Sequence, residues 1–589
     1  MATVPSYCVP RRCGICRFVL DDGELFVVVR DGKVVSRELS FRRWVDEEDI
    51  RCSECRNGCP HQFSEPAVGC HPECLGFVPP ESLSAFIEAT SYRYQPQTIE
   101  DKRRIRWLQN TWSSILCETY HLPLELCDYI AQYCLRPFAV LRALASWENV
   151  RATSRISFST KVWARYTLFE GVRYISSVTN EQASETDTGA KLVFDPGSGP
   201  NDTTILVGED HLGVRELLVL PSSKNRTVRE RPNIWWRSVT VPRSDPELES
   251  QVDGIKLRSL TRGEESPQIL WRLPQQSTKV MHLFPLKIRY PFKAIRMSAF
   301  ECNDPAITGY SVYHSFGIRA IHAHRRGEGA DCYKIEPVMF GVWQYMPIDE
   351  DESLVEIWAH YDGYIPIPSL MFKTDKGRMR FMGAWPLDHR SGWTLLAQPS
   401  KEPSWICYNA RAGHTRVFGL EAPPPTPDGR GPDIPMPLSR CPRECQEPYY
   451  YSSAHLDGVS LVTPSLACIG DTSVITGLLL RHSNKHTSSV GQVRLDSLGP
   501  PFKVRPSDRL YLGLLETNMG GHCVVIAATS RPSDTRSIVW LDLPWHGLLE
   551  WWFSYRQCKI HHGNKSSPDT CTVTPALYQK WLMQKRGQP

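Results

Sequence analysis

The sequence lacks any run of about 18 consecutive apolar residues, so it predicts no transmembrane helix. Its first residues also lack the charged segment followed by an apolar run that is typical of a secretory signal. We therefore expect an intracellular protein, in the cytoplasm, the nucleus or both. The formal net charge is +4 for 589 residues, and acidic and basic side chains are mixed along the chain. Such a small charge argues against nucleic acid as a partner, because nucleic-acid-binding proteins concentrate positive charge.

Short catalytic motifs are also absent from the sequence. It contains no P-loop, no G-x-G-x-x-G after a strand pattern, no nucleophile elbow and no H-E-x-x-H. His322 and His324 would share one face of a strand, but no acidic residue at a useful spacing accompanies them, so we expect solvated or core histidines. We therefore expect a protein that binds other molecules and is not an enzyme.

Cysteine, by contrast, is abundant and unevenly distributed. The chain has 20 cysteines, and eight of them lie within the first 74 residues. In a reducing compartment they should not form disulfides. Isolated cysteines behave as small apolar core residues, but the crowded ones at the start of the chain need another explanation.

The spacing of these cysteines predicts a zinc-binding module over residues 1–80. A C-x-x-C pair places two thiolates on one tight turn, where both reach a single zinc ion at about 2.3 Å. The nine candidate ligands are Cys13, Cys16, Cys52, Cys55, Cys59, His61, Cys70, His71 and Cys74. They suit two zinc ions, or one ion with spare cysteines, and the zinc would be structural because protein groups fill every ligand place.

Our preferred pairing places Cys13, Cys16, His71 and Cys74 on one ion. The second ion would then be bound by Cys52, Cys55, Cys70 and either Cys59 or His61. A module of about 65 residues with few large apolar side chains needs bound metal ions to stabilise its fold. The alternatives are a redox-active C-x-x-C motif and buried free thiols.

A hairpin that turns at Asp31-Gly32 is expected between the two C-x-x-C pairs. A cysteine turn leading into a hairpin, with a later ligand pair on a short helix, resembles treble-clef and cross-braced zinc modules. The segment from Cys70 to Cys74 resembles the H-x-x-C step of RING, LIM and PHD fingers. A RING ends with a further C-x-x-C pair, however, and none follows Cys74.

Residues 98–175 are expected to form a helical segment. Apolar residues recur at helical spacing from Ile105 to Leu116, and a proline suits the first turn of the next helix. This segment resembles an F-box, on Leu122-Pro123, Glu125, Ile130 with Tyr133, Phe138 to Leu141 with Leu144, Trp147, and Ser159 to Trp163. In that family these helices dock on the adaptor of a cullin ubiquitin ligase. The resemblance implies a docking surface made of Leu122, Pro123, Leu126, Ile130 and Leu141, and the alternative is a helical packing unit without a partner.

From residue 176 onward the sequence predicts strands and turns. We expect a first β-rich unit at 176–400, a proline-rich linker region at 401–445, a second β-rich unit at 446–565 and a tail at 566–589. A similar order of strand patterns after Tyr310 and after Val474 suggests two copies of one sheet unit.

The segment Ser369 to Gly377 resembles jacalin-type β-prism lectins. The sugar-binding loop of that family is G-x-x-x-D, whereas Gly383 to Asp388 is one residue longer here. The resemblance implies a β-prism and carbohydrate as a ligand, and a plain β-sandwich is the alternative fold.

Together these features predict a multidomain α+β protein with a small zinc head, a short helical segment and a large, mainly antiparallel β region. The overall arrangement is similar to multidomain proteins of filamentous fungi. The function we expect is protein interaction, as an F-box-type substrate receptor whose β domains bind a client. A lectin-like carbohydrate-binding protein is the first alternative, and a RING-like ubiquitin ligase is the second.

Overall fold

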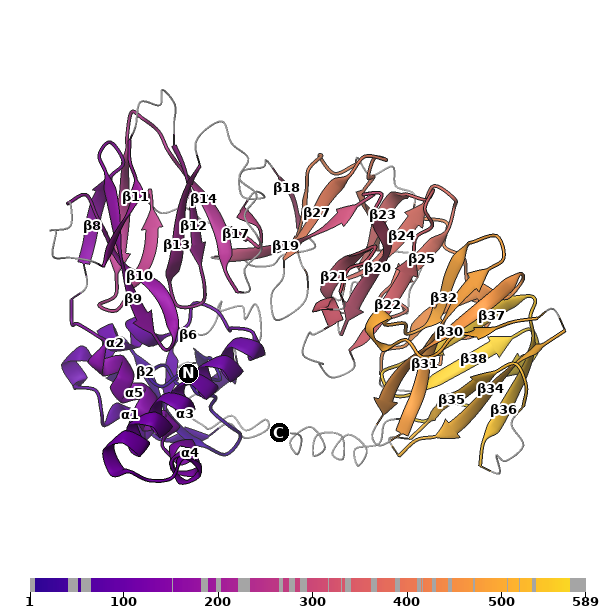
Figure 1. Ribbon diagram of the computed structural model, residues 1–589, viewed down its shortest axis with the longest axis horizontal. Helices are drawn as coiled ribbons and strands as arrows, with labels where there is room; N and C mark the ends of the chain where they lie inside the picture. Colours follow the sequence, from indigo (N-terminus) through magenta and orange to yellow (C-terminus); the bar gives the residue numbers. More distant parts are fainter. Residues whose placement is uncertain are drawn as a thin grey trace, which may run out of the picture. The chain divides into compact units, whose positions relative to one another are not determined.

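The computed structural model describes the chain in two compact units. It covers all residues except 1–5, 41–50, 55–64, 151, 182–188, 197–202, 221–232, 264–267, 275–280, 286–293, 316, 330, 334–340, 362–367, 387–391, 410–414, 416, 426–430, 443–446, 470–471, 506, 519, 532–536 and 573–589. Unit 1 consists of Met1–Lys279 and Arg289–Met297, and unit 2 of Val280–Ile288 and Ser298–Pro589 (Figure 1). Among the described residues, no helix combines the length and apolar character needed to cross a bilayer.

Short strands build the head of unit 1. They are β1 (Ser6–Val9), β2 (Leu25–Arg30), β3 (Lys33–Val34), β4 (Leu39–Ser40), β5 (Arg51–Glu54), β6 (Glu65–Pro66) and β7 (Val68–Cys70). The expected hairpin is confirmed, because β2 and β3 pair antiparallel around Asp31 and Gly32, which both have positive φ. Strand β2 also pairs with β7, with Val27 opposite Cys70, and this pairing brings the two ends of the head together.

The helices follow the head strands along the chain and lie together with them (Figure 1). They are α1 (Pro72–Leu75), α2 (Leu83–Thr90), α3 (Thr98–Tyr120), α4 (Leu124–Tyr133) and α5 (Leu135–Ala145). The prediction of a helical segment to residue 175 is wrong beyond Ala145. Ser159 to Trp163, the last part of the F-box resemblance, lies in the turn before strand β9 (Val162–Phe169) and in the first residues of that strand. Burial there alternates, with Val162 and Ala164 inside, which is the period of a strand and not of a helix.

Strands form the rest of unit 1. They are β8 (Ala152–Ser157), β9 (Val162–Phe169), β10 (Val172–Thr179), β11 (Ala190–Phe194), β12 (Thr203–Glu209), β13 (Val214–Leu220), β14 (Trp235–Val241), β15 (Glu247–Val252), β16 (Leu257–Thr261), β17 (Gln268–Trp271) and the first part of β19 (Ala294–Cys302). Three groups of neighbouring strands occur, in the orders β10-β9-β11, β16-β15-β8 and β13-β12-β14-β17-β19. Their inner faces share one apolar core around Ile175, Val207 and Leu257.

Unit 2 is built from strands and short 3₁₀ turns in its described residues. Its first group comprises β18 (His282–Pro285), β20 (Ile307–His314), β21 (Ile318–Arg325), β22 (Val342–Pro347), β23 (Leu354–Tyr361), β24 (Pro368–Thr374), β25 (Met379–Met382), β26 (Trp393–Ala397), β27 (Ser404–Asn409) and β28 (Val417–Leu420). The second group comprises β29 (Tyr450–His455), β30 (Val459–Ile469), β31 (Thr472–His482), β32 (Thr487–Gly491), β33 (Phe502–Lys503), β34 (Arg509–Glu516), β35 (His522–Ala528), β36 (Val539–Pro544), β37 (Leu548–Phe553), β38 (Cys558–His562) and β39 (Lys565–Ser566).

The expected mainly antiparallel β region is confirmed, but its internal division differs from the prediction. The boundary between the compact units lies near residues 280–298, and the expected linker at 401–445 contains strands β27 and β28. The described residues of unit 2 nevertheless include two large apolar cores, one around Phe372 and one around Leu478. The prolines at 422–437 therefore separate two cores within one unit and not two units.

The expected internal repeat is not visible in the strand order. The segment after Tyr310 forms two separate sheets, β21-β20-β22 and β25-β24-β23-β26. The segment after Val474 belongs to one sheet of seven strands, in the order β33-β30-β31-β35-β34-β36 with β32 on β31. Of the lectin-like motif, Ser369 to Gly377 forms β24 and the turn after it, whereas Asp388 lies outside the described residues.

Candidate metal centre

Four buried side chains of the head gather at one point in unit 1. One ligand atom from each of Cys13, Cys16, His71 and Cys74 lies within 4.8 Å of the others. None of the four residues is more than 2% exposed. Three sulfurs and one imidazole nitrogen at this separation are a donor set that suits a tetrahedral ion. The group could therefore hold a metal ion, and it is the same quartet that the spacing favours for the first ion.

The backbone positions both halves of the quartet. The turn that carries Cys13 and Cys16 is closed by hydrogen bonds from the Cys13 N–H to the Phe18 carbonyl (3.0 Å) and from the Arg17 N–H to the Cys13 carbonyl (2.9 Å). Gly14 allows this turn to lie against β7, because a Cβ there would meet a Val68 methyl carbon at 2.2 Å. A larger residue at position 14 would push the two cysteines away from β7.

The second half of the quartet comes from the start of α1. His71 is the N-cap of α1, Pro72 occupies the first turn, and the Cys74 N–H donates to the His71 carbonyl at 3.0 Å. The spacing of three residues places the imidazole and the thiol on the same side of this turn. The antiparallel pairing of β7 with β2 then holds α1 next to the cysteine turn.

The orientation of the His71 ring suits a metal ligand. Its Nδ1 lies 3.3 Å from the Cys16 sulfur and 3.7 Å from the Cys74 sulfur. Its Nε2 lies 3.4 Å from a carboxylate oxygen of Glu24, and Glu24 in turn pairs with Arg136 of α5. A histidine that binds a metal through one nitrogen usually directs the other to a carboxylate, which fixes the ring and increases its basicity.

The thiols of the quartet show the electrostatic effect of their crowding. Burial raises the pKa of Cys13, but hydrogen bonds from Cys16, Cys70, Cys74 and His71 hold it well below the ordinary value. Interaction with Cys13 raises the pKa of Cys74, and that of Cys70 as well. Neighbouring thiols thus compete for one negative charge. A divalent cation would remove this competition, because it stabilises every thiolate that binds it.

The other predicted zinc ligands are not gathered into a second site by the described residues. Cys70 is buried at the end of β7, and its thiol interacts with Cys13 of the first group. Cys52 lies in β5, whereas Cys55, Cys59 and His61 lie outside the described residues. The second ion therefore stays a prediction.

Sequence reasoning missed Glu24 and Arg136. Neither residue belongs to a motif: Glu24 precedes β2, and Arg136 lies in α5, far away along the chain. Only the folded arrangement brings Glu24 to the Nε2 of His71 and Arg136 to Glu24.

The predicted adaptor-binding residues lie on and around α4. We define the α4 stripe as Leu122, Leu126, Ile130 and Tyr133, which follow one another at helical spacing along one side of the helix. All four are exposed, Leu126 by 51% and Tyr133 by 73%. Pro123 precedes α4 and is exposed, and Leu141 is exposed on α5.

A second group of ligand-type residues lies in unit 2. His322, His324 and Cys332 each place one ligand atom within 4.8 Å of the others. His324 is buried, however, and its Nε2 bonds with the hydroxyls of Ser311 (2.8 Å) and Tyr333 (3.2 Å), while His322 pairs with Glu328. Burial lowers the pKa of His324 to about 4. This environment is that of a neutral core histidine beside a partly exposed one, as the sequence predicts.

Comparison with known proteins gives no family for this chain. No family model matches it, and no curated protein matches it. A chain from the crystal structure of lamprey immune protein is similar over 48% of this chain and 82% of that chain, with 10% sequence identity and a TM-score of 0.14. A TM-score this low supports no conclusion about fold or function.

Proposed function

We propose that this chain is a protein-interaction protein of the F-box type. In this proposal α3, α4 and α5 dock on the adaptor of a cullin ubiquitin ligase through the α4 stripe, and the β region binds a client. The exposure of the α4 stripe is the observation that carries the proposal.

The distribution of large and small residues around α4 supports docking. The buried side of α4 presents Cys127 and Ala131, and Cys127 lies against Cys117 of α3. The large apolar side chains instead point to solvent. A helix that only packs within its own domain would bury the large residues, because they contribute most of the hydrophobic free energy. An exposed row of leucine, isoleucine and tyrosine is typical of a surface that another protein covers.

The head is consistent with this role, because it would hold the helices in a fixed position. We propose that the quartet Cys13, Cys16, His71 and Cys74 binds structural zinc, since three sulfurs and one imidazole around a closed, buried point suit that ion best. Arg136 of α5 pairs with Glu24, which lies against His71. The metal centre and the helices that carry the α4 stripe are thereby joined by direct contacts.

Affinity capture with a cullin adaptor tests the proposal. The intact chain should capture the adaptor, and Leu126→Asp combined with Ile130→Asp should reduce capture at least about tenfold, since charges on this face cannot be desolvated without a partner. Leu438→Asp is the matched control: this residue is 83% exposed and lies in unit 2. Failure of the intact chain to capture the adaptor, or equal capture by the double variant, would reject the proposal.

The two alternatives make different predictions for the same protein. A lectin-like protein would bind on a glycan array and would not capture the adaptor. A RING-like ligase would discharge ubiquitin from a charged conjugating enzyme, and this activity would depend on Cys52 and Cys55. Neither alternative requires the α4 stripe to be exposed.

A further inference from the structure

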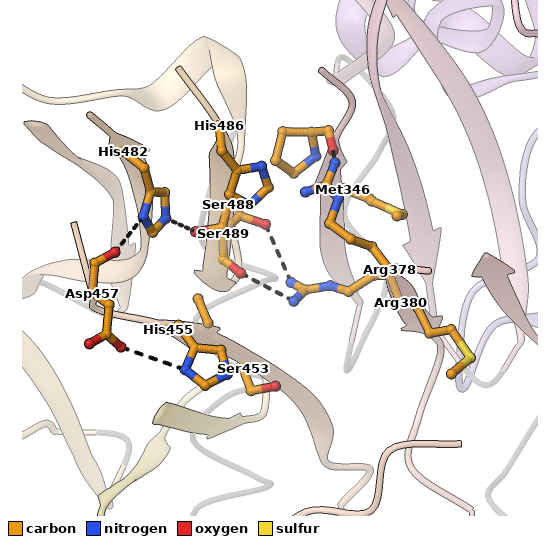
Figure 2. A pocket seen from close by; sticks show the side chains of 13 residues that line it. Met346, Arg378, Arg380, Ser453, His455, Asp457, His482, His486, Ser488 and Ser489 are labelled. Carbon is orange, nitrogen blue, oxygen red and sulfur yellow. Dashed lines mark hydrogen bonds and ion pairs between the residues drawn. The ribbon is translucent and has the colours of Figure 1, made fainter. Parts of the chain in front are cut away.

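A cavity of about 380 Å³ lies within unit 2, between strands of its two cores. Its walls come from β22, the start of β25, the end of β29, and the turn from β31 into β32 (Figure 2). Met346, Met379 and Ala454 give it apolar surface, and Arg380, His482 and Ser489 give it polar surface. A cavity of this size is in the range that accepts a small organic molecule.

Arg380 is the unusual residue of this cavity. It is only 8% exposed. Its guanidinium donates from Nη1 to the Ser489 carbonyl at 3.1 Å and lies 3.5 Å from the Ser489 hydroxyl through Nη2 (Figure 2). Its Nε–H is buried and has no hydrogen-bond partner among the described residues. Burial lowers the pKa of Arg380 to about 10, so the side chain still carries its charge at neutral pH.

Arg380 differs in this respect from the other buried arginines. The described part of the chain buries five more, each with a carboxylate within 4.0 Å: Arg17 and Arg104 with Glu170, Arg237 with Glu209, Arg258 with Asp253, and Arg556 with Glu447. Among the residues that the structure describes, no carboxylate forms an ion pair with Arg380. A buried charge without a counter-ion is costly, and proteins normally avoid it.

The remaining charged groups of the cavity are already balanced. Arg378 donates from Nε to Glu352 at 2.6 Å and makes a second contact to the same carboxylate. His486 pairs with Asp349 at 2.7 Å. The Asp457 carboxylate accepts from the Gly547 N–H at 2.9 Å and lies 3.7 Å from His455. His482 bonds through Nδ1 to the Asp457 carbonyl and through Nε2 to the Ser488 hydroxyl. One uncompensated positive charge, that of Arg380, therefore remains.

We propose that this cavity binds a small molecule that carries an oxyanion, with Arg380 as its counter-ion. The Nε–H and Nη–H groups of Arg380 match a pair of oxygens of a phosphate or carboxylate group. The methionine and alanine surface accommodates an apolar remainder of the ligand. This site is independent of the α4 stripe and of the metal centre, which both belong to unit 1.

Thermal unfolding of the full chain with simple anions tests the site. Inorganic phosphate and acetate are titrated separately against chloride at equal ionic strength. Binding to the folded state should raise the Tm of unit 2 in proportion to the logarithm of anion concentration. The anion that acts at the lower concentration identifies the oxyanion class. If neither anion raises the Tm above the chloride control, the proposal is overturned.

Two variants of Arg380 and one control connect the effect to this residue. Arg380→Met should abolish the anion-dependent shift, and without anion it should be at least as stable as the parent, because a buried unpaired charge is removed. An Arg380→Met variant that folds but has a lower Tm than the parent without anion, or that retains the anion-dependent shift, would overturn the proposal. Arg494→Met, which removes a partly exposed arginine paired with Asp496, should retain the full shift.

Arg380→Lys decides the matter if Arg380→Met does not fold. It keeps the charge but cannot make two parallel hydrogen bonds to one oxyanion. The dissociation constant of the effective anion, measured by calorimetry, should rise at least about threefold in this variant. An affinity equal to that of the parent would overturn the proposal.

Discussion

Individual residues outside any motif affect how well the candidate metal centre can bind an ion. The quartet was predicted because C-x-x-C and H-x-x-C spacings place ligands on tight turns irrespective of the rest of the fold. Glu24 could not be predicted, since a single glutamate before a hairpin resembles any surface residue. Its role follows from its distance of 3.4 Å to the Nε2 of His71, which depends on the pairing of β2 with β7.

Substitution of Glu24 tests this role. Glu24→Gln should weaken zinc binding about 10-fold to 100-fold, because a neutral amide orients and polarises the imidazole less than a carboxylate does. Competition with a chromophoric chelator measures the affinity. Asp22→Asn is a suitable control, since Asp22 is an exposed acidic residue of the same turn that pairs with Arg11. An unchanged zinc affinity in Glu24→Gln would show that the carboxylate does not support the ligand.

At the scale of elements, three parts of unit 1 meet at one buried carboxylate. Glu170, in the turn between β9 and β10, accepts from Arg17 of the cysteine turn at 2.6 Å and from Arg104 of α3 at 2.7 Å. All three side chains are buried. Arg104 also donates to the Cys16 carbonyl at 2.8 Å. These contacts join the head, the helices and the β-hairpin.

Removal of the Glu170 charge should destabilise unit 1. Glu170→Gln leaves two buried guanidinium groups without a counter-ion, which should reduce the free energy of unfolding by about 3–5 kcal/mol. Urea unfolding measures this change. Glu247→Gln, which alters an exposed pair with Arg155, should change the stability little. A loss below about 1 kcal/mol for Glu170→Gln would contradict the role of the carboxylate as the junction.

The Glu170 carboxylate also makes the free energy of unfolding of unit 1 depend on pH, and the direction of this dependence follows from the pKa of Glu170. Burial raises the pKa of Glu170, but the charges of Arg104 and Arg17 outweigh it and hold the pKa below the ordinary value of 4.5. The unfolded chain therefore binds the proton more readily than the folded chain. The stabilisation is complete above pH 4.5 and is lost as the pH falls through the folded-state pKa. Glu170→Gln should remove this part of the acid sensitivity.

The elements also show why the sequence predicted some helices and strands better than others. Helices α3 to α5 have clear apolar periodicity and were expected. The segment 152–175 was assigned to the helical region because Ser159 to Trp163 fitted the F-box pattern. The positive φ of Glu170 and Gly171 and the alternating burial on both sides are the features of a hairpin. In that assignment the family resemblance was given more weight than the alternation of apolar and polar residues, which has the period of a strand.

Exposure is the property of α4 that periodicity could not predict. The pattern of Leu126, Ile130 and Tyr133 would normally indicate the buried side of an amphipathic helix. In the structure the small Cys127 and Ala131 face the interior instead. Which side of a helix is buried depends on the partner elements, and these are known only from the fold.

For the whole molecule, each unit has apolar cores of its own, so the two units should unfold as separate transitions. Removal of the proposed zinc ion by excess strong chelator should lower or abolish the transition of unit 1, because Cys13, Cys16 and Cys74 belong to the same apolar core as Phe26 and Phe86. The transition of unit 2 should keep its midpoint, since the proposed zinc ligands all belong to unit 1.

Differential scanning calorimetry with and without chelator measures both midpoints, and Glu170→Gln identifies which transition belongs to unit 1. Restoring zinc should return the lowered transition to its original temperature. A chelator-treated chain that holds no zinc and retains both midpoints would show that the quartet contributes no metal-dependent stability. Equal shifts of both transitions would show instead that the two units unfold together, and the separate cores would then not act as separate cooperative units.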